Sequence, residues 1–297
     1  MTTATAAASG ATATAAASGA TATAAASGAN ATQRFTTDKS MSASTPPERV
    51  SMLAREVLDA VHRTVREHKV TYEEYNALKA WLISVGQDGE WPLFLDVWVE
   101  HVVEEVASEN RDGSKGTIEG PYYVPGAPEL GSDAVLPTRD GEQGTPLVFQ
   151  GQVTGVDGSP LPGAVIEIWH ADADGFYSQF APGIPEWNLR GTVTADDQGH
   201  FRIRTVKPAP YQIPTDGACG KLISAAGWHP WRPAHLHLKV GATGHEQITT
   251  QLYFPGDAHN DDDVASAVKP ELVLDPRDVD GGQEVTYDFV LDRADRV

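Results

Sequence analysis

Cysteine is almost absent from this sequence: Cys219 is the single one among 297 residues. An intrachain disulfide framework and a cysteine-rich metal site are therefore excluded. Basic residues are also scarce, with 22 Lys and Arg against 41 Asp and Glu and a formal net charge of −19. Because nucleic acids and anionic membranes are recognised through basic surfaces, this balance argues against both as partners.

Long apolar runs are missing as well. No stretch approaches the roughly 20 apolar residues that a membrane-spanning helix needs. The N-terminal residues also lack the basic-then-apolar pattern of a signal peptide. We therefore expect a soluble, cytoplasmic protein, long enough for one large domain or two smaller ones.

The first part of the chain has low complexity. Residues 2–28 are three passes of a nine-residue unit rich in alanine, threonine, serine and glycine. Each unit carries β-branched threonines and a glycine, and none has an apolar stripe that could dock on a core. We predict a disordered tail over residues 1–44.

Helical patterns follow the tail. Thr45 precedes two prolines and Glu48, which predicts an N-cap at Thr45 with proline at the first helical position. Valines and leucines then recur at helical spacing up to Val65. A second helix should open with a capping box formed by Thr71 and Glu74.

Gly86 is expected to end the second helix, and Pro92 to begin a third that runs to Val106. Together the helices predict a small helical domain over residues 45–110. Valine stripes, such as Val57-Val61-Val65 and Val99-Val103-Val106, can pack within one subunit or against a partner.

From residue 145 the apolar pattern changes to a period of two, interrupted by glycine, proline and aspartate turns. The predicted strands are 147–153, 164–169, 191–194, 200–206, 235–240, 248–254 and 284–291. No helical pattern is visible between them, which argues against a parallel sheet. We predict a mainly β protein with an α-helical N-terminal region, in which residues 111–297 form an antiparallel β-sandwich.

The segment from Trp231 to Val240 is unusual among these strands. As a strand it directs Ala234, Leu236, Leu238 and Val240 to one face, and His235 and His237 to the other. Two imidazoles on one face can bind a single metal ion. Taken alone, the pair favours two hydrogen-bonded core histidines over a metal site.

Two tyrosines precede this strand in irregular segments. Tyr177 lies in the loop that leaves the 164–169 strand, and Tyr211 lies among prolines that hold the chain extended. Loops at one end of a sandwich commonly carry functional groups. Each tyrosine by itself is also compatible with a packing role and a hydrogen-bonded hydroxyl.

Six motifs occur together in a distinctive order: Gly120-Pro-Tyr-Tyr-Val-Pro-Gly-Ala-Pro128, Glu167-Ile-Trp-His-Ala-Asp172, Gly175-Phe-Tyr-Ser178, Pro208-Ala-Pro-Tyr211, Arg232-Pro-Ala-His-Leu-His237 and Thr249-Thr-Gln251. In this combination the sequence resembles the intradiol ring-cleavage dioxygenases from about Thr45 to the C-terminus. The helical segment before the sandwich is similar to the catechol 1,2-dioxygenase branch, and in particular to its actinobacterial members.

The resemblance implies a non-haem Fe(III) ion, one per subunit, with Tyr177, Tyr211, His235 and His237 as ligands and hydroxide or water in a fifth position. Phenolates are hard anionic donors that suit a ferric ion, whereas zinc rarely recruits tyrosine. The resemblance also implies a small-molecule catechol and O2 as substrates, with cis,cis-muconate as product in the degradation of aromatic compounds.

The resemblance assigns further roles. Tyr211 would leave the metal and accept a substrate proton, Arg232 would stabilise anionic charge beside the ring, and Gln251 would be a polar neighbour. Arg232 could instead form an ordinary ion pair. Six residues match positions that line the substrate pocket: Ile118, Pro121, Tyr122, Arg232, Val264 and Ala265. The alternative for the pocket positions is ordinary loop packing. The remaining histidines with no partner in the motifs are expected to be structural, namely His170, His200, His229, His245 and His259.

The family also suggests a homodimer formed through the N-terminal helices, which can enclose lipid. Chlorocatechol and hydroxyquinol 1,2-dioxygenases share the same ligands, so the preferred catechol stays open. An alternative from a different class is a transthyretin-like binding module without metal, which would give no reason for the tyrosines and histidines to converge.

Overall fold

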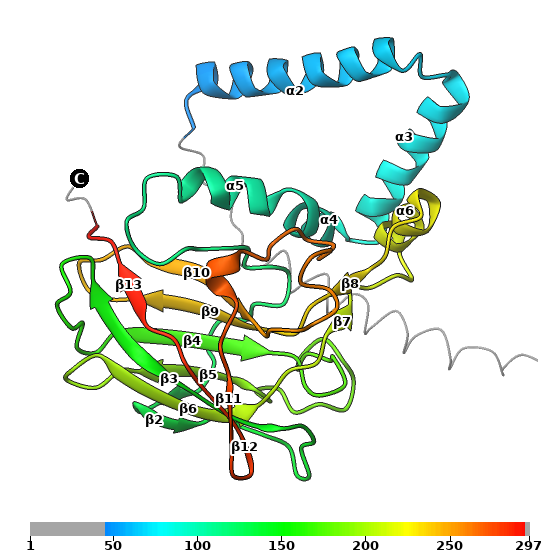
Figure 1. Ribbon diagram of the computed structural model, residues 1–297. Helices are drawn as coiled ribbons and strands as arrows, with labels where there is room; N and C mark the ends of the chain where they lie inside the picture. Colours follow the sequence, from blue (N-terminus) through cyan, green and yellow to red (C-terminus); the bar gives the residue numbers. More distant parts are fainter. Residues whose placement is uncertain (1–44, 295–297) are drawn as a thin grey trace, which may run out of the picture.

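A computed structural model describes residues 45–294 of the chain, so the predicted tail over residues 1–44 lies outside the described residues. The described part is a β-sandwich, and the helices lie together on one side of it (Figure 1). This confirms the predicted fold class. Within residues 45–294, no helix is long and apolar enough to cross a bilayer.

Most of the helices come from the first third of the described residues. They are α2 (Pro47–Glu67), α3 (Tyr72–Gln87), α4 (Trp91–Trp98) and α5 (Glu100–Ala107), followed much later by α6 (Ala218–Ala226) and the short 3-10 helix η1 (Pro270–Leu272). The capping box predicted for α3 is confirmed, because the Glu74 amide donates to the Thr71 hydroxyl and the Thr71 amide donates to the Glu74 carboxylate.

Three helix boundaries were predicted wrongly. Thr45 does not cap α2: Pro46 is the N-cap, without a side-chain hydrogen bond, because a residue before proline is driven to an extended backbone. Gly86 lies inside α3, and the left-handed turn comes at Gly89 with φ 70°. The expected third helix is two helices, broken at Val99, whose φ and ψ are −127° and −38°.

Helix α3 leads away from the sandwich, and α2 runs back above α5, separate from the sheets (Figure 1). Helix α2 has no buried residue, and its apolar side chains are exposed, Val57 by 64% and Val61 by 50%. Helix α5, in contrast, is tied to the sandwich, because Lys269 Nζ lies 2.6 Å from Glu104 Oε2.

Two sheets form the sandwich. The five-stranded sheet has the order β1 (Glu129–Leu130), β5 (Arg190–Thr194), β4 (Val165–His170), β9 (His235–Gly241) and β10 (Ile248–Tyr253). The six-stranded sheet has the order β11 (Arg277–Val279), β12 (Gly282–Thr286), β3 (Pro146–Gly155), β6 (His200–Val206) and β2 (Asp133–Val135), with β13 (Phe289–Leu291) paired to β3. A separate ribbon joins β7 (Tyr211–Gln212) to β8 (Trp231–Arg232).

The sandwich is not antiparallel throughout. The central pairs β4–β9, β9–β10, β4–β5 and β3–β6 are antiparallel, as is β11–β12. The pairs β1–β5, β2–β6, β12–β3 and β13–β3 are parallel. The single strand predicted over 284–291 is two strands. The ladder is interrupted at Tyr287, although the register against β3 is the same on both sides. The Tyr287 carbonyl oxygen comes within 2.0 Å of where a side chain on Gly151 would begin, so residue 151 must be glycine.

Candidate metal and substrate site

Strand β9 alternates as predicted. Leu236, Leu238 and Val240 point between the two sheets into the main hydrophobic core. His235 and His237 point to the outer face of the five-stranded sheet, where each is at most 1% exposed. Strand β9 therefore carries core on one side and the candidate site on the other.

Neighbouring strands set the surroundings of His237 through their register. Trp169 of β4 and Gln251 of β10 are its direct partners, so their side chains share its face of the sheet. The Trp169 indole stacks on the His237 ring, with centroids 4.8 Å apart and planes inclined by 10°.

Tyr177 lies in a loop organised by Asp172. One oxygen of Asp172 accepts hydrogen bonds from the amides of Asp174 and Phe176, at 3.0 and 2.9 Å. Its other oxygen accepts from Arg139 at 2.8 Å. These bonds curl the chain directly after β4 and direct Tyr177 back over the sheet.

Tyr211 reaches the site through the short β7–β8 ribbon. Prolines on both sides confine this pairing to two residues, and Tyr211 is the direct cross-strand partner of Arg232. Gly175, at φ +87°, lies against it, and a side chain there would begin 2.9 Å from the Tyr211 Cβ. Only glycine fits that position, because φ is positive and because there is no room for a Cβ.

The four predicted ligands converge. The Tyr177 hydroxyl lies 3.1 Å from His237 Nε2 and 3.5 Å from His235 Nε2, and the two Nε2 atoms are 3.0 Å apart. The Tyr211 hydroxyl hydrogen-bonds to that of Tyr177. The structure thus brings all four side chains together, while their role as metal ligands stays a prediction.

Hydrogen bonds orient both imidazoles. His235 Nδ1 donates to the Pro233 carbonyl at 2.7 Å, which leaves a lone pair on its Nε2 directed into the site. Gln251 Nε2 donates to His237 Nδ1 at 3.2 Å, so the proton of His237 is on Nε2 and bridges to His235. A cation bound by both Nε2 atoms would move that proton to His237 Nδ1, and the hydrogen bond from Gln251 would be given up.

Burial dominates the electrostatics. It lowers the pKa of His235 to about 3, with a further contribution from Arg232, and it lowers the pKa of His237 well below the usual value, helped by His235. Both rings are therefore neutral, as metal ligands must be. Burial also raises the pKa of Tyr177, reinforced by Tyr211, and that of Tyr211, where Arg232 works in the opposite direction.

Two neutral imidazoles beside two buried phenols fit a highly charged cation. Neither phenol ionises readily in such a dry site without a positive charge to offset the loss of solvation. Hard oxygen donors combined with imidazole favour ferric iron over softer metals. The residues present therefore suit the metal that the resemblance implies.

Arg232 is 2% exposed and forms a buried ion pair. Its Nε and Nη2 donate to the two carboxylate oxygens of Asp263, both at 3.0 Å, and Nη2 also donates to Gln251 Oε1 at 2.9 Å. Tyr253 donates to the same Gln251 oxygen at 2.8 Å. Burial raises the pKa of Asp263, but Arg232 outweighs that effect and the net pKa is lowered.

Asp263 and Arg190 were not predicted. Asp263 sits at the end of a run of three aspartates, and nothing local distinguishes it. Arg190, 1% exposed, donates to the Ser178 hydroxyl at 2.8 Å, to the Ser178 carbonyl at 3.1 Å and to the Tyr122 carbonyl at 2.9 Å. It thereby joins the residue after Tyr177 to the wall of the site.

One cavity adjoins the site. It has a volume of about 500 Å³ and is lined by Tyr122, Tyr177 and Tyr211 together with Phe176 and Trp231. A second cavity of about 530 Å³ is lined by Val264 and by Trp98, Gly227, Trp228 and His229, but by none of the four converging side chains.

The other expected pocket residues lie deeper. Ile118, Pro121 and Ala265 are buried and are not among the residues lining these two cavities. Gly120, at φ +73°, brings the backbone close to His237. A Cβ at position 120 would lie 3.5 Å from the ring carbon Cε1 of His237. The amides of Glu119 and Gly120 are held by the Glu100 carboxylate of α5, at 3.0 and 3.2 Å.

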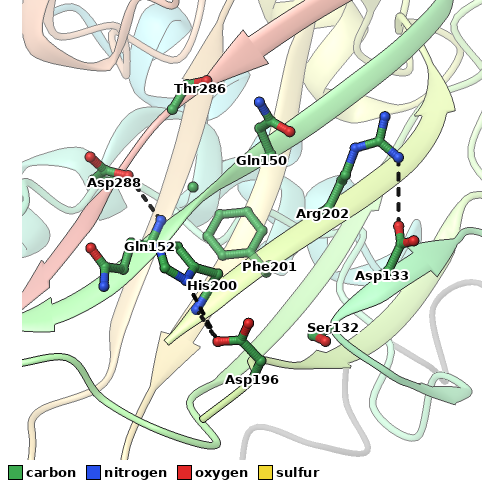
Figure 2. Close-up of a pocket in the computed structure, with 11 residues that line it drawn as sticks. Ser132, Asp133, Gln150, Gln152, Asp196, His200, Phe201, Arg202, Thr286 and Asp288 are labelled. Carbon is green, nitrogen blue, oxygen red and sulfur yellow. Dashed lines mark hydrogen bonds and ion pairs between the residues drawn. The ribbon is translucent and has the colours of Figure 1, made fainter. Parts of the chain in front are cut away.

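A groove of about 490 Å³ lies on the six-stranded sheet and includes none of the predicted site residues. Figure 2 shows its polar side chains paired with one another: Arg202 faces Asp133 at 3.6 Å, and His200 faces Asp196 at 3.8 Å. These pairs leave no convergent set of free groups that would indicate chemistry.

Comparison with known families and structures agrees with this geometry. A family described as "Dioxygenase" matches residues 118–293, and one described as "Catechol dioxygenase N terminus" matches residues 47–115. Together these two matches cover the helices α2 to α5 and nearly the whole sandwich.

Individual relatives extend over most of the chain. A chlorocatechol 1,2-dioxygenase from Rhodococcus opacus is 41% identical over 250 residues, which is 82% of this chain and 97% of the relative. A catechol 1,2-dioxygenase from Acinetobacter baylyi is 36% identical, with 76% of each chain covered. The crystal structure of a 3-chlorocatechol 1,2-dioxygenase from Rhodococcus opacus superposes with a TM-score of 0.80 and 44% identity, covering 84% of this chain and all of the other.

Proposed function

Because the chain belongs to the intradiol ring-cleavage dioxygenases, we propose that it binds one ferric ion per subunit and cleaves catechol between its two hydroxyl-bearing carbons. Dioxygen is the second substrate and cis,cis-muconate the product. The proposed ligands are Tyr177, Tyr211, His235 and His237.

One observation carries this proposal. Two phenol oxygens and two imidazole nitrogens from three separate segments converge, with the Tyr177 oxygen and the two Nε2 atoms within 3.5 Å of one another. A metal-free binding module would not need to bury four such groups together, since each costs free energy to desolvate. The metal-free transthyretin-like alternative therefore has less support.

Tyr211 is the proposed proton acceptor. Both tyrosines line the cavity, but the Tyr177 hydroxyl lies within 3.5 Å of both histidine Nε2 atoms. When bound, the ferric ion would supply Lewis acidity to the reaction of the substrate with dioxygen. Tyr211 can take a proton from a substrate hydroxyl while Tyr177 and the histidines retain their positions.

Arg232 is proposed to stabilise negative charge on the substrate. Its guanidinium is held by Asp263 and Gln251, and Nη1 lies 3.4 Å from His235 Nε2. A fixed cation in a dry site stabilises developing charge more strongly than it would in water. Gln251 contacts both Arg232 and His237, and so links the substrate side of the site to the ligand side.

The preferred catechol has two candidates. Plain catechol is the substrate that we expected, whereas the Rhodococcus relatives named above are described as acting on chlorinated catechols. Those names favour a ring-chlorinated substrate as the second candidate, and hydroxyquinol remains the third. Turnover rates on catechol, 4-chlorocatechol and hydroxyquinol, measured on one preparation, would rank the three.

An absorption spectrum of the iron-loaded protein tests the core of the proposal. Tyrosinate bound to ferric iron should give a visible band that shifts when catechol is added without oxygen. A colourless iron-loaded protein that turns over none of the three substrates would refute the assignment.

Tyr211→Phe tests the proton role separately. The variant should turn over more slowly while keeping substantial iron, because three ligands and the cavity remain. Unchanged kcat would remove Tyr211 from its assigned role.

We also propose a homodimer formed through the N-terminal helices, where the family resemblance adds the option of enclosed lipid. The exposed apolar side chains of α2 support this, because a patch of that kind commonly marks an interface. Val57→Asp with Val61→Asp should convert the dimer to a monomer in analytical ultracentrifugation, and a wild-type monomer would contradict the proposal.

A further inference from the structure

His229, His259 and Asp262 form a second cluster of potential metal ligands, apart from the four converging residues. Each offers one donor atom, and the three atoms lie within 4.8 Å of one another. His259 Nδ1 is 3.0 Å from Asp262 Oδ1, and His229 Nε2 is 3.4 Å from Asp262 Oδ2. None of the three residues takes part in the reaction proposed above.

We propose that this cluster is a second metal site, for a divalent transition ion of the zinc class. Adjacent ligands bound at about 2.1 Å from one ion are separated by roughly 3.0–3.4 Å. Both donor distances fall in that range, but they involve different oxygens of Asp262, so the carboxylate must bind through both oxygens or turn as the two histidines approach each other. Two imidazoles and one carboxylate suit zinc-class ions, whereas calcium and magnesium require oxygen ligands.

Packing holds the ligands in place before any ion binds. The Trp231 indole stacks on the His259 ring, with centroids 5.2 Å apart and planes inclined by 3°. The His259 amide donates to Asp257 at 3.0 Å, and the second carboxylate oxygen of Asp257 accepts from the Ala234 amide at 2.9 Å. The loop that carries two of the ligands is thereby fastened to the segment between β8 and β9.

His229 requires the largest adjustment. The Trp231 amide donates to its Nδ1 at 3.2 Å, so the ring proton is on Nε2 and faces Asp262. Binding an ion at Nε2 moves that proton to Nδ1 and gives up the bond from Trp231. We therefore expect His259 and Asp262 to form the stronger pair, with His229 completing the site.

The surroundings suit an ion that enters from solvent. The three side chains are between 22% and 54% exposed, so water can complete the coordination. The loop also carries Asp257, Asp261 and Asp263, and the whole chain has a net charge of −19, which attracts cations. A bound ion would fasten the segment before Arg232 to the loop that ends at Asp263, and so brace their ion pair from outside the catalytic site.

Zinc titration of the iron-loaded full-length protein tests the site. Calorimetry should give one zinc per chain, and elemental analysis of the same sample should show that iron is retained. His259→Ala and Asp262→Asn should each weaken zinc binding at least tenfold, and His229→Ala should do so too because it removes one of three ligands. Zinc should raise the melting temperature of the wild type and leave that of Asp262→Asn unchanged.

His200→Ala is the matched control, because His200 faces Asp196 in a partly exposed pair without a second histidine (Figure 2). It should bind zinc as the wild type does. The proposal is overturned if zinc binds only by displacing iron, or if any of the three ligand variants binds zinc with wild-type affinity. Since iron and zinc are counted separately, failure of this site would be distinguishable from failure of the proposed iron centre.

Discussion

The two faces of strand β9 are equally dry and yet chemically opposite. Leu236 and Leu238 on the inner face are 0% exposed, and His235 and His237 on the outer face are 1% and 0% exposed. On the inner face burial releases free energy, because apolar surface leaves water. On the outer face it costs free energy unless every polar atom finds a partner. Burial alone therefore does not separate core from site, whereas the partners of the buried atoms do.

Among variants on the two faces of β9, His237→Ala is expected to have the largest effect on turnover and iron binding. Removing this imidazole deletes a proposed ligand and leaves Gln251 Nε2 without its ring acceptor. We expect turnover to fall to background and the visible band or the bound iron to be lost, while the protein stays folded. Elemental analysis and circular dichroism would check both parts, with the exposed His200→Ala as control. Full retention of iron and colour would refute ligation.

Asp263→Asn should affect both stability and activity. The change leaves the buried Arg232 guanidinium without its charge partner, which typically costs about 3–5 kcal/mol of unfolding free energy. Arg232 would also lose its fixed orientation, so the KM for catechol should rise. Urea unfolding and steady-state kinetics measure the two effects, and the exposed neighbour Asp261→Asn should show neither.

Leu238→Ala is the inner-face counterpart of His237→Ala. It should lower the unfolding free energy by about 2–5 kcal/mol through lost burial and a cavity. Turnover per iron-loaded, folded molecule should stay close to the wild-type value, because the side chain points away from the site. A large fall in kcat with unchanged stability would show that the faces are not separable.

The smallest expected effect is a loss of stability at low pH that involves His170. This imidazole lies between the sheets, where Nδ1 donates to the Ala171 carbonyl and Nε2 accepts from the Thr205 hydroxyl, both at 2.7 Å. Burial lowers its pKa to about 4. The unfolded chain therefore binds the proton first, and stability should fall as the pH drops from 6.5 towards 4, by at most roughly 3 kcal/mol. His170→Gln should flatten this part of the stability profile, as measured by urea unfolding between pH 7.5 and 5.

Much of β9 was predictable because its pattern is local. The alternation of leucine with histidine identifies the two faces, and the two tyrosines follow from motifs on neighbouring loops. The Asp263–Arg232 pair was not predictable, because three consecutive aspartates look alike until the loop places one of them inside. Arg190 escaped notice for a similar reason: its partners are a hydroxyl and two carbonyls, of which the carbonyls carry no sequence signature.

The strand boundaries were predicted wrongly where they depend on backbone that is distant in the sequence. The break at Tyr287 depends on Gly151, which lies on another strand, and no window of sequence contains both. The parallel pairs β1–β5, β2–β6 and β12–β3 likewise join residues that are far apart in the sequence. At Pro46, in contrast, the information was local: a residue before proline favours an extended backbone, which places the N-cap one residue later than predicted.

Helix α2 has a consequence for how the chain folds. Its 21 residues have no buried side chain, whereas most of the stability of a helix in a protein comes from packing of its apolar face. Its amide protons should therefore exchange at a rate set by the protein concentration, since only contact with another subunit can protect them. The amides of the sandwich should exchange at a rate independent of concentration. Hydrogen exchange at two dilutions would then divide one continuous chain into a part that folds alone and a part that folds on assembly.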